Sequence, residues 1–287
     1  MLITIIILLF VIIGFTLFLA SYSYKFKKEE NKYTPAKYGF DFEEIKIPTK
    51  NDKNLYAWWV PAENLNNEIK PTIILVHGWS RNIDRTMAFI KKLHPAGYNL
   101  IAFDSRCHGK SDDDKFSSMV KFMEDIRATI DFSEKLPNVD TDRIGVLGLS
   151  IGGAASIYAA SLDKRIKSVV TVGAFSHPSR VMEVEFKKRK IPYYPFIWLI
   201  FKYMEFRIGA TFDEIAPSNN IDQTNASIFL IHGVDDATAP VSHADQLYNA
   251  GNPENVELWK IEGKGHSDCN HHPEFWKKVL DFYKTSL

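Results

Sequence analysis

The sequence predicts an α/β protein with a mostly parallel sheet of eight strands flanked by helices. From about residue 42 onward, short β-rich segments alternate with segments of helical periodicity. The runs Ile73–Val76 and Ile228–Ile231 are apolar at every position, as is typical of strands that are buried on both faces. The chain has 287 residues, of which 45% are hydrophobic, so it can form one domain with a large core.

Eight short apolar segments, rich in β-branched and aromatic residues, are expected to be strands. In chain order they are Phe42–Ile47, Leu55–Val60, Thr72–Val76, Asn99–Phe103, Arg143–Leu147, Lys167–Val172, Ser227–Ile231 and Val256–Ile261. Helical periodicity covers Asp84–Leu93, Ser117–Lys135, Ser150–Ala160, Val241–Ala250 and Pro273–Lys284. Because no helix separates the first two strands, we expect an antiparallel opening followed by a parallel sheet.

The first 24 residues are apolar or uncharged, and Lys25 is the first charged residue. A run of this length is about what an α-helix needs to cross the bilayer core. A cleaved signal peptide usually starts with basic residues and has a shorter apolar stretch. We therefore expect a single-pass transmembrane anchor at residues 1–24.

A polar segment, residues 25–38, follows and is expected to be a juxtamembrane linker to a globular domain at residues 39–287. The segment carries four basic residues close to the anchor: Lys25, Lys27, Lys28 and Lys32. The positive-inside tendency then favours a cytoplasmic domain. In a single-span protein the folding domain also influences orientation, so the sidedness stays open.

Residues 175–225 separate two predicted strands by more chain than a single crossover helix requires. This segment contains a basic cluster, Lys187–Lys190, and an aromatic run, Tyr193–Phe201. We expect a helical lid here. Its aromatic run either packs on the core as an ordinary cap or contacts lipid.

The strongest local signal is the sequence Gly148-Leu149-Ser150-Ile151-Gly152, which lies between a predicted strand and a predicted helix. A sharp strand-to-helix turn needs glycine on both sides, since a Cβ at either place would collide with neighbouring backbone. Such a nucleophile elbow would present the Ser150 hydroxyl above the sheet. By itself the pattern is common, and an ordinary glycine-rich turn explains it about equally well.

A serine hydroxyl needs a general base and a group that orients the base before it becomes a useful nucleophile. Two loops downstream supply such groups, and both follow predicted strands. The first contains Asp235 and Asp236, and the second contains His266 between small and polar residues. The carboxyl ends of parallel strands are where open sheets bind ligands, so we expect these side chains to lie near Ser150.

With these motifs, the chain resembles the α/β-hydrolase superfamily, and within it the serine-dependent esterases, lipases, thioesterases and aminopeptidase-like members. The resemblance extends over about residues 40–287. It is carried by the elbow, by the acid and histidine loops, by His77-Gly78-Trp79, and by the segment from Asp104 to Ser111. It implies an α/β-hydrolase fold with a lid.

The resemblance also implies a catalytic set. Ser150 would be the nucleophile, His266 the base and Asp236 the acid, because the family's acid loop places the aspartate between positions matching His232 and Pro240. Asp235 remains an alternative, since the two carboxylates differ by one residue of register. The main-chain amides of Trp79 and Ile151 would form the oxyanion hole. His77 and His108 occupy positions that the family uses structurally.

Several other classes of function are disfavoured. The 35 basic and 35 acidic residues balance, so the chain has no net positive charge that would favour binding to nucleic acid. Cys107 and Cys269 have no redox or metal-like spacing, and we expect both to be inert. The adjacent His271 and His272 lack the spacing of metal ligands. We expect neither a metal nor a cofactor.

These features predict a serine hydrolase that cleaves carboxylic ester or thioester bonds through an acyl-enzyme. We expect a small, hydrophobic, acyl-bearing substrate, and a lipid is one candidate. A peptidase or amidase of the same fold, and a catalytically silent membrane-tethered binding protein, remain alternatives. The oligomeric state stays open.

Overall fold

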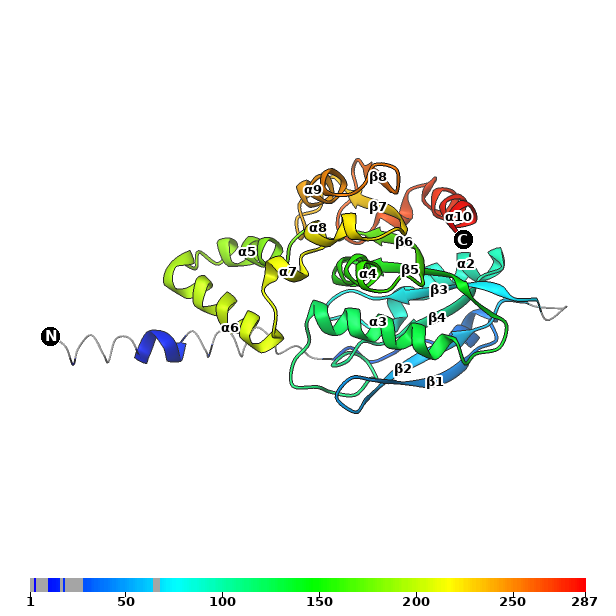
Figure 1. The fold of residues 1–287 in the computed structure, drawn as a ribbon, viewed down its shortest axis with the longest axis horizontal. Helices are drawn as coiled ribbons and strands as arrows, with labels where there is room; N and C mark the ends of the chain where they lie inside the picture. The colour runs from blue at the N-terminus through cyan, green and yellow to red at the C-terminus, as the bar shows by residue number, and fades with distance from the viewer. Residues whose placement is uncertain (1–2, 4–9, 16–17, 19–27, 64–67) are drawn as a thin grey trace.

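The structure, a computed structural model, describes residue 3, residues 10–15, residue 18, residues 28–63 and residues 68–287 (Figure 1). The transmembrane anchor predicted at residues 1–24 therefore lies mostly outside the described residues. Among the residues that are described, none belongs to a helix with the length and apolar character needed to cross a membrane. The anchor remains a prediction.

The described residues form one sheet of eight strands in the order β1-β2-β4-β3-β5-β6-β7-β8. The strands are β1 (Glu43–Thr49), β2 (Lys53–Val60), β3 (Lys70–Val76), β4 (Asn99–Phe103), β5 (Val139–Leu149), β6 (Ile166–Val172), β7 (Ser227–Gly233) and β8 (Val256–Ile261). β2 pairs antiparallel with both β1 and β4, and every later pairing is parallel. The predicted strands and the predicted fold class are confirmed.

Helices cover both faces of the sheet (Figure 1). One core packs α3 (Met119–Ser133), α4 (Ile151–Leu162) and α9 (Ser242–Ala250) against the sheet. The other core contains α2 (Met87–Leu93) and α10 (Phe275–Ser286). Because both faces are covered, the central strands carry apolar side chains in both directions, as the uniformly apolar runs predicted.

The helix predicted at Asp84–Leu93 differs in its first turn. Residues Ile83–Thr86 form a 3₁₀ turn, and the α-helix begins only at Met87. The buried Asp104 carboxylate accepts a hydrogen bond from the Ile83 amide at 2.7 Å, and the Asn82 side chain accepts one from the Asp84 amide. These polar contacts hold the chain in a tighter turn than an α-helix allows.

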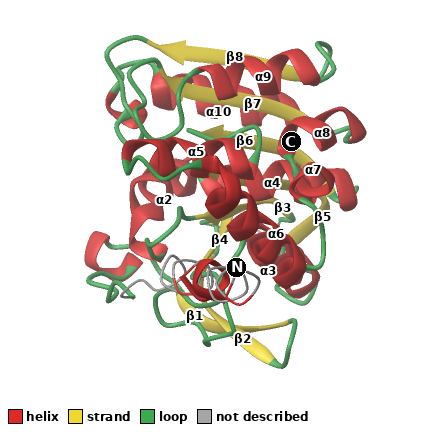
Figure 2. Cartoon of the chain, turned by 90° about the vertical axis from the view of Figure 1, so that its left-hand side faces the viewer, coloured by secondary structure: helices red, strands yellow, loops and turns green. Residues whose placement is uncertain are grey.

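The excursion between β6 and β7 is helical. It comprises α5 (Pro178–Lys188), a π-helical turn η4 (Tyr193–Ile197), α6 (Trp198–Ile208) and the short helices α7 (Phe212–Ile215) and α8 (Pro217–Asn220). In Figure 1, α5 and α6 project beyond the sheet, and Figure 2 shows them in front of its edge. We call residues 175–225 the lid.

The described part of the predicted linker lies along the domain surface. The Lys28 ammonium pairs with Asp113 at 2.7 Å, and the Asn31 side chain donates to the Asp104 carboxylate at 3.2 Å. The Arg81 guanidinium pairs with Glu29 at 2.7 Å. Residues 28–34 thus contact the loops that follow β3 and β4, close to the carboxyl edge of the sheet.

Candidate active site

Ser150 lies at the turn between β5 and α4, at the carboxyl edge of the sheet. Its backbone has φ 54° and ψ −119°, which is a strained conformation for a residue with a side chain. The Ser150 amide donates to the Val172 carbonyl at 2.9 Å, so the turn is tied to the end of β6. This geometry is that of a nucleophile elbow.

The flanking glycines are required by close backbone contacts. A Cβ at Gly148 would lie 2.4 Å from the backbone of Gly152, and a Cβ at Gly152 would lie 2.5 Å from the His77 carbonyl oxygen. Neither contact can be relieved by a side-chain rotation, because the opposing atoms are backbone. The sequence requirement inferred for Gly148 and Gly152 is therefore matched by the packing.

Three predicted site residues from three different loops lie within hydrogen-bond distance of each other. The His266 Nε2 atom is 2.9 Å from the Ser150 hydroxyl oxygen, and the His266 Nδ1 atom is 2.6 Å from the Asp236 Oδ2 atom. With Nδ1 protonated, His266 donates to the carboxylate and its Nε2 accepts from the hydroxyl. The arrangement can transfer a proton from Ser150 to His266.

Asp236, and not Asp235, faces the histidine. Asp236 is 4% exposed, whereas Asp235 is exposed to solvent. The Asp236 Oδ1 atom accepts hydrogen bonds from the amides of Thr238 and Ala239, both at 2.8 Å. The geometry therefore favours Asp236 for the role of orienting acid.

The surroundings of Asp236 stabilise its charged form. Burial by itself raises the pKa of this carboxyl, but hydrogen bonds from His232, His266 and the Ala239 amide outweigh burial and hold the pKa well below its usual range. A carboxylate that stays ionised can stabilise an imidazolium at His266. His232 lies 3.3 Å from the carboxylate and is the site contact that sequence reasoning missed.

The loop after β3 lies beside the elbow. A Cβ at Gly78 would be 3.5 Å from the Ser150 Cβ atom, so the next residue, Trp79, is close to the nucleophile. Ile151 is the first residue of α4, and its amide lies at the N-terminus of that helix. The two residues predicted to form the oxyanion hole therefore follow Gly78 and Ser150 in the chain, on two segments that approach each other at the elbow.

Two buried histidines connect this loop to the loop after β4. The His77 Nδ1 atom lies 2.7 Å from the Gly78 carbonyl, and its Nε2 accepts from the Ser105 amide at 3.0 Å. The His108 Nε2 accepts from the Ser80 amide at 3.3 Å. Burial lowers the pKa of His77 to about 4 and the pKa of His108 to about 3. Both imidazole rings are therefore neutral, and their hydrogen bonds connect the loop after β3 to the loop after β4.

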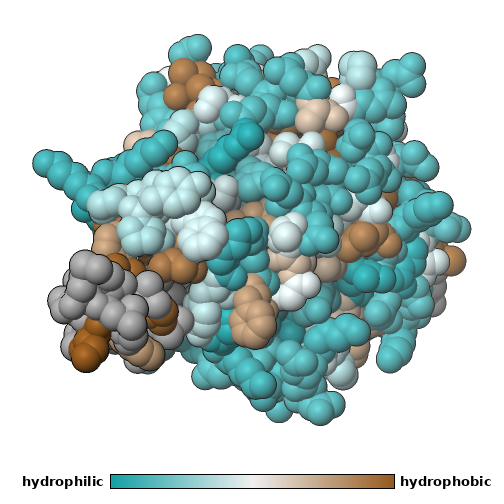
Figure 3. All heavy atoms as spheres, turned by 60° about the vertical axis from the view of Figure 1, so that its left-hand side comes forward, coloured by the Kyte–Doolittle hydropathy of each residue, from teal (hydrophilic) through white to brown (hydrophobic). Residues whose placement is uncertain are grey.

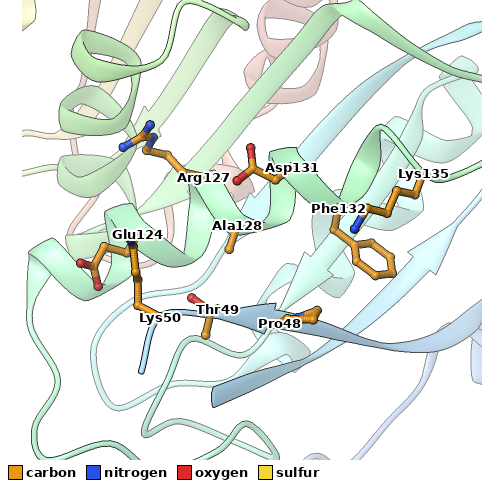
Figure 4. A pocket seen from close by; sticks show the side chains of 9 residues that line it. All are labelled: Pro48, Thr49, Lys50, Glu124, Arg127, Ala128, Asp131, Phe132 and Lys135. Carbon is orange, nitrogen blue, oxygen red and sulfur yellow. The ribbon is translucent and has the colours of Figure 1, made fainter. Parts of the chain in front are cut away.

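Among the described residues no cluster of three or more His, Cys, Asp or Glu side chains is arranged to hold a metal. Burial raises the pKa of the Cys269 thiol to about 11, which disfavours a reactive thiolate. A pocket of about 330 Å³ lies between β1 and α3 (Figure 4), and none of its lining residues belongs to the candidate site.

The lid contacts the acid loop. The Lys188 ammonium, at the end of α5, donates to the Ala237 carbonyl at 3.2 Å. Buried lid residues, among them Ile200 and Phe201, share one apolar core with Ile151, and Trp79 packs against it. The lid therefore covers the edge of the sheet at which the candidate site lies.

Comparisons with known proteins agree with this architecture. The family "Serine aminopeptidase, S33" matches residues 67–201. The esterase Pf2001 of Pyrococcus furiosus has a similar structure, with a TM-score of 0.72 and 26% identity over 91% of this chain and 98% of that one. The chain therefore has the α/β-hydrolase fold, and its structural similarity to the esterase extends over nearly the whole of both chains.

Two curated relatives are described as uncharacterised. The chain is 37% identical over 121 residues to a 31.7 kDa protein of the traX-finO intergenic region of Escherichia coli, and this match spans 41% of each protein. It is 24% identical over 255 residues to YfhR of Escherichia coli K12, spanning 85% of this chain and 81% of YfhR. The first match therefore spans about two fifths of that relative's length.

The choice between the two adjacent carboxylates is testable. We expect Asp236→Asn to lower kcat for a soluble ester by about 10³- to 10⁴-fold, because an amide neither fixes the tautomer of His266 nor stabilises its charge. The matched variant Asp235→Asn should keep kcat near the parent value, since that side chain is exposed. A larger loss of kcat in Asp235→Asn than in Asp236→Asn would reverse the assignment.

The buried neutral histidines predict a pH dependence of stability. Their pKa is below the ordinary value of 6.5 in the folded chain, so between about pH 6.5 and 4 the unfolded chain binds protons that the folded chain does not. Stability should therefore fall as the pH falls through this window, by about 2 kcal/mol per histidine at pH 5.

Urea denaturation at pH 7 and pH 5 measures this effect. His108→Gln should reduce the loss of unfolding free energy between the two pH values by about 2 kcal/mol, because it removes one titrating group. The exposed His271→Gln serves as the control and should behave like the parent. Equal losses in His108→Gln and the parent would contradict the role of His108 as a buried neutral ring.

Proposed function

We propose that this chain is a serine hydrolase that cleaves carboxylic ester or thioester bonds through an acyl-enzyme formed on Ser150. The observation that carries the proposal is the continuous hydrogen-bonded path from buried Asp236 through His266 to Ser150. Such a path converts a weakly nucleophilic hydroxyl into one that can give up its proton during attack.

In the first half-reaction the Ser150 oxygen attacks the acyl carbon while His266 Nε2 takes the hydroxyl proton. The amides of Trp79 and Ile151 donate to the oxygen of the tetrahedral intermediate. The bond to the leaving alcohol or thiol then breaks, and the leaving group departs with the proton from His266. In the second half-reaction water attacks the acyl carbon, again losing a proton to His266, and Ser150 is regenerated as the acid product leaves.

The substrate is proposed to carry a hydrophobic acyl group. The proposal is supported by the apolar inner surface of the lid, whose buried residues are part of the large core that also contains Ile151. An apolar lining discriminates acyl groups by length, since each methylene that fits contributes to transition-state binding. No cofactor enters the proposed reaction.

A peptidase or amidase is the second candidate, because the matching family is described as serine aminopeptidases. Esters, thioesters and amides share the same tetrahedral chemistry, so the site geometry is compatible with all three. The similar structure from Pyrococcus furiosus is that of an esterase, and its similarity extends over 91% of this chain, which favours the ester class.

We further propose that residues 1–24 anchor the enzyme in a membrane as a single-pass protein with its catalytic domain in the cytoplasm. The support is the uncharged apolar run and the lysines that follow it. Protease protection of intact vesicles distinguishes the two orientations of the domain.

Labelling with a fluorophosphonate tests the nucleophile. The parent chain should be labelled, and mass spectrometry should locate the adduct on the peptide that contains Ser150. Ser150→Ala should abolish labelling, while Ser156→Ala, a buried serine of the same helix, should retain it. Labelling that persists undiminished in folded Ser150→Ala would exclude the proposed nucleophile.

The acyl preference is tested with monomeric esters of increasing chain length. Phe186 is half-buried on α5 and packs on the shared core, so Phe186→Ala should lower the ratio of kcat/KM for long over short acyl groups by about tenfold or more. Phe206→Ala removes an exposed aromatic ring of the same lid and should leave the ratio unchanged. An unchanged ratio in both variants would reject the lid as the acyl-binding surface.

A further inference from the structure

The helix α6 carries aromatic residues on two different faces. One face is buried in the core and contains Ile200, Phe201 and Met204. The other carries Trp198, Lys202 and Phe206 at intervals of four residues, so these side chains form one stripe along the helix. Trp198 is 39% exposed and Phe206 is 81% exposed.

The stripe continues into the preceding turn. Tyr193 and Tyr194 are exposed, and the Tyr194 ring lies 6.5 Å from the Trp198 ring between centroids. We call these residues, namely Tyr193, Tyr194, Trp198, Lys202 and Phe206, the outer lid face. Tyr and Trp are the residues that proteins place at the membrane–water interface, where the ring is apolar and one end stays hydrated.

Basic residues are frequent in the segment that carries the outer lid face. Between residues 178 and 208 the chain has seven basic and three acidic residues. These three acidic side chains pair with Lys187, Arg189 and Lys202, which leaves an excess of positive charge on residues 178–208. Residues 209–225 of the lid add three acidic residues and no lysine or arginine. Lys190, at the turn between α5 and η4, is exposed. Excess basic charge beside exposed aromatic rings complements an anionic lipid surface.

The face is also continuous with the apolar N-terminal segment. Residues 10–15 are helical, and Phe10, Val11 and Phe15 are each more than half exposed. The Phe15 ring contacts the Phe196 ring edge-on, with 6.1 Å between centroids. Figure 1 shows residues 10–15 on the same side of the molecule as α5 and α6, and Figure 3 shows apolar atoms gathered on this side while most of the remaining visible face is hydrophilic.

From these observations we propose that the outer lid face is a membrane-contact surface that rests on an anionic lipid bilayer. The aromatic rings enter the interfacial region while the exposed Lys190 meets the headgroups. This proposal rests on the proposed hydrolase function and adds a route by which substrate reaches the active site. It places the lid between the bilayer and Ser150, so acyl substrates reach the site from the membrane.

Quenching of tryptophan fluorescence by brominated lipids tests this contact without requiring turnover. The full chain, carrying Ser150→Ala, is reconstituted in vesicles of phosphatidylcholine and phosphatidylglycerol with brominated acyl chains. Six tryptophans emit in the parent. We expect Trp198→Phe to remove a quenched component of the emission, and we expect that component to weaken when phosphatidylglycerol is omitted.

The matched control is Trp276→Phe, on α10 at a distance from the lid. Trp276 is half-buried and packs against Phe89, so its removal should leave the quenched component unchanged. If Trp198→Phe loses no quenched emission, the outer lid face does not contact lipid. Crosslinking of this face to a second copy, without quenching, would likewise overturn the proposal. Because the variant is inactive, neither outcome depends on the proposed chemistry.

Discussion

The proposed catalysis depends on one hydrogen-bonded path, from Asp236 through His266 to Ser150. This path joins loops at the ends of β7, β8 and β5. Those loops meet only because parallel strands end at one edge of the sheet. The buried sheet fixes the backbone positions, and short donor–acceptor distances then fix the side chains. A shift of one loop by about an ångström would be enough to impair proton transfer.

The packing around the path is adapted to hold it. The strained backbone at Ser150 persists because Gly148 and Gly152 pack closely against neighbouring backbone and hold the turn in place. Asp236 remains ionised in a buried place because amides and histidines donate to both of its oxygens. On the opposite side, His77 and His108 connect the loop of Trp79 to the loop after β4. The contacts that hold these loops in place therefore also position the groups of the proposed catalytic site.

Much of this arrangement could be predicted from the sequence, for identifiable reasons. Strands such as Ile73–Val76 are apolar without interruption because both faces are buried, and the glycines around Ser150 mark a turn that other residues cannot form. The contacts of residues 28–34 with Asp104 and Arg81 could not be predicted, since polar side chains in an irregular segment carry no periodicity. The contact of His232 with Asp236 could not be predicted either, since spacing along the chain does not show which way the histidine ring points.

The most direct measurement of the central claim is an acid quench of the enzyme during turnover of an ester, followed by mass spectrometry of its peptides. The account predicts a mass increase equal to the acyl group on the peptide containing Ser150, and its disappearance as the substrate is exhausted. Turnover with an acyl group attached to another residue, or with no acylated peptide under conditions in which deacylation is rate-limiting, would contradict it.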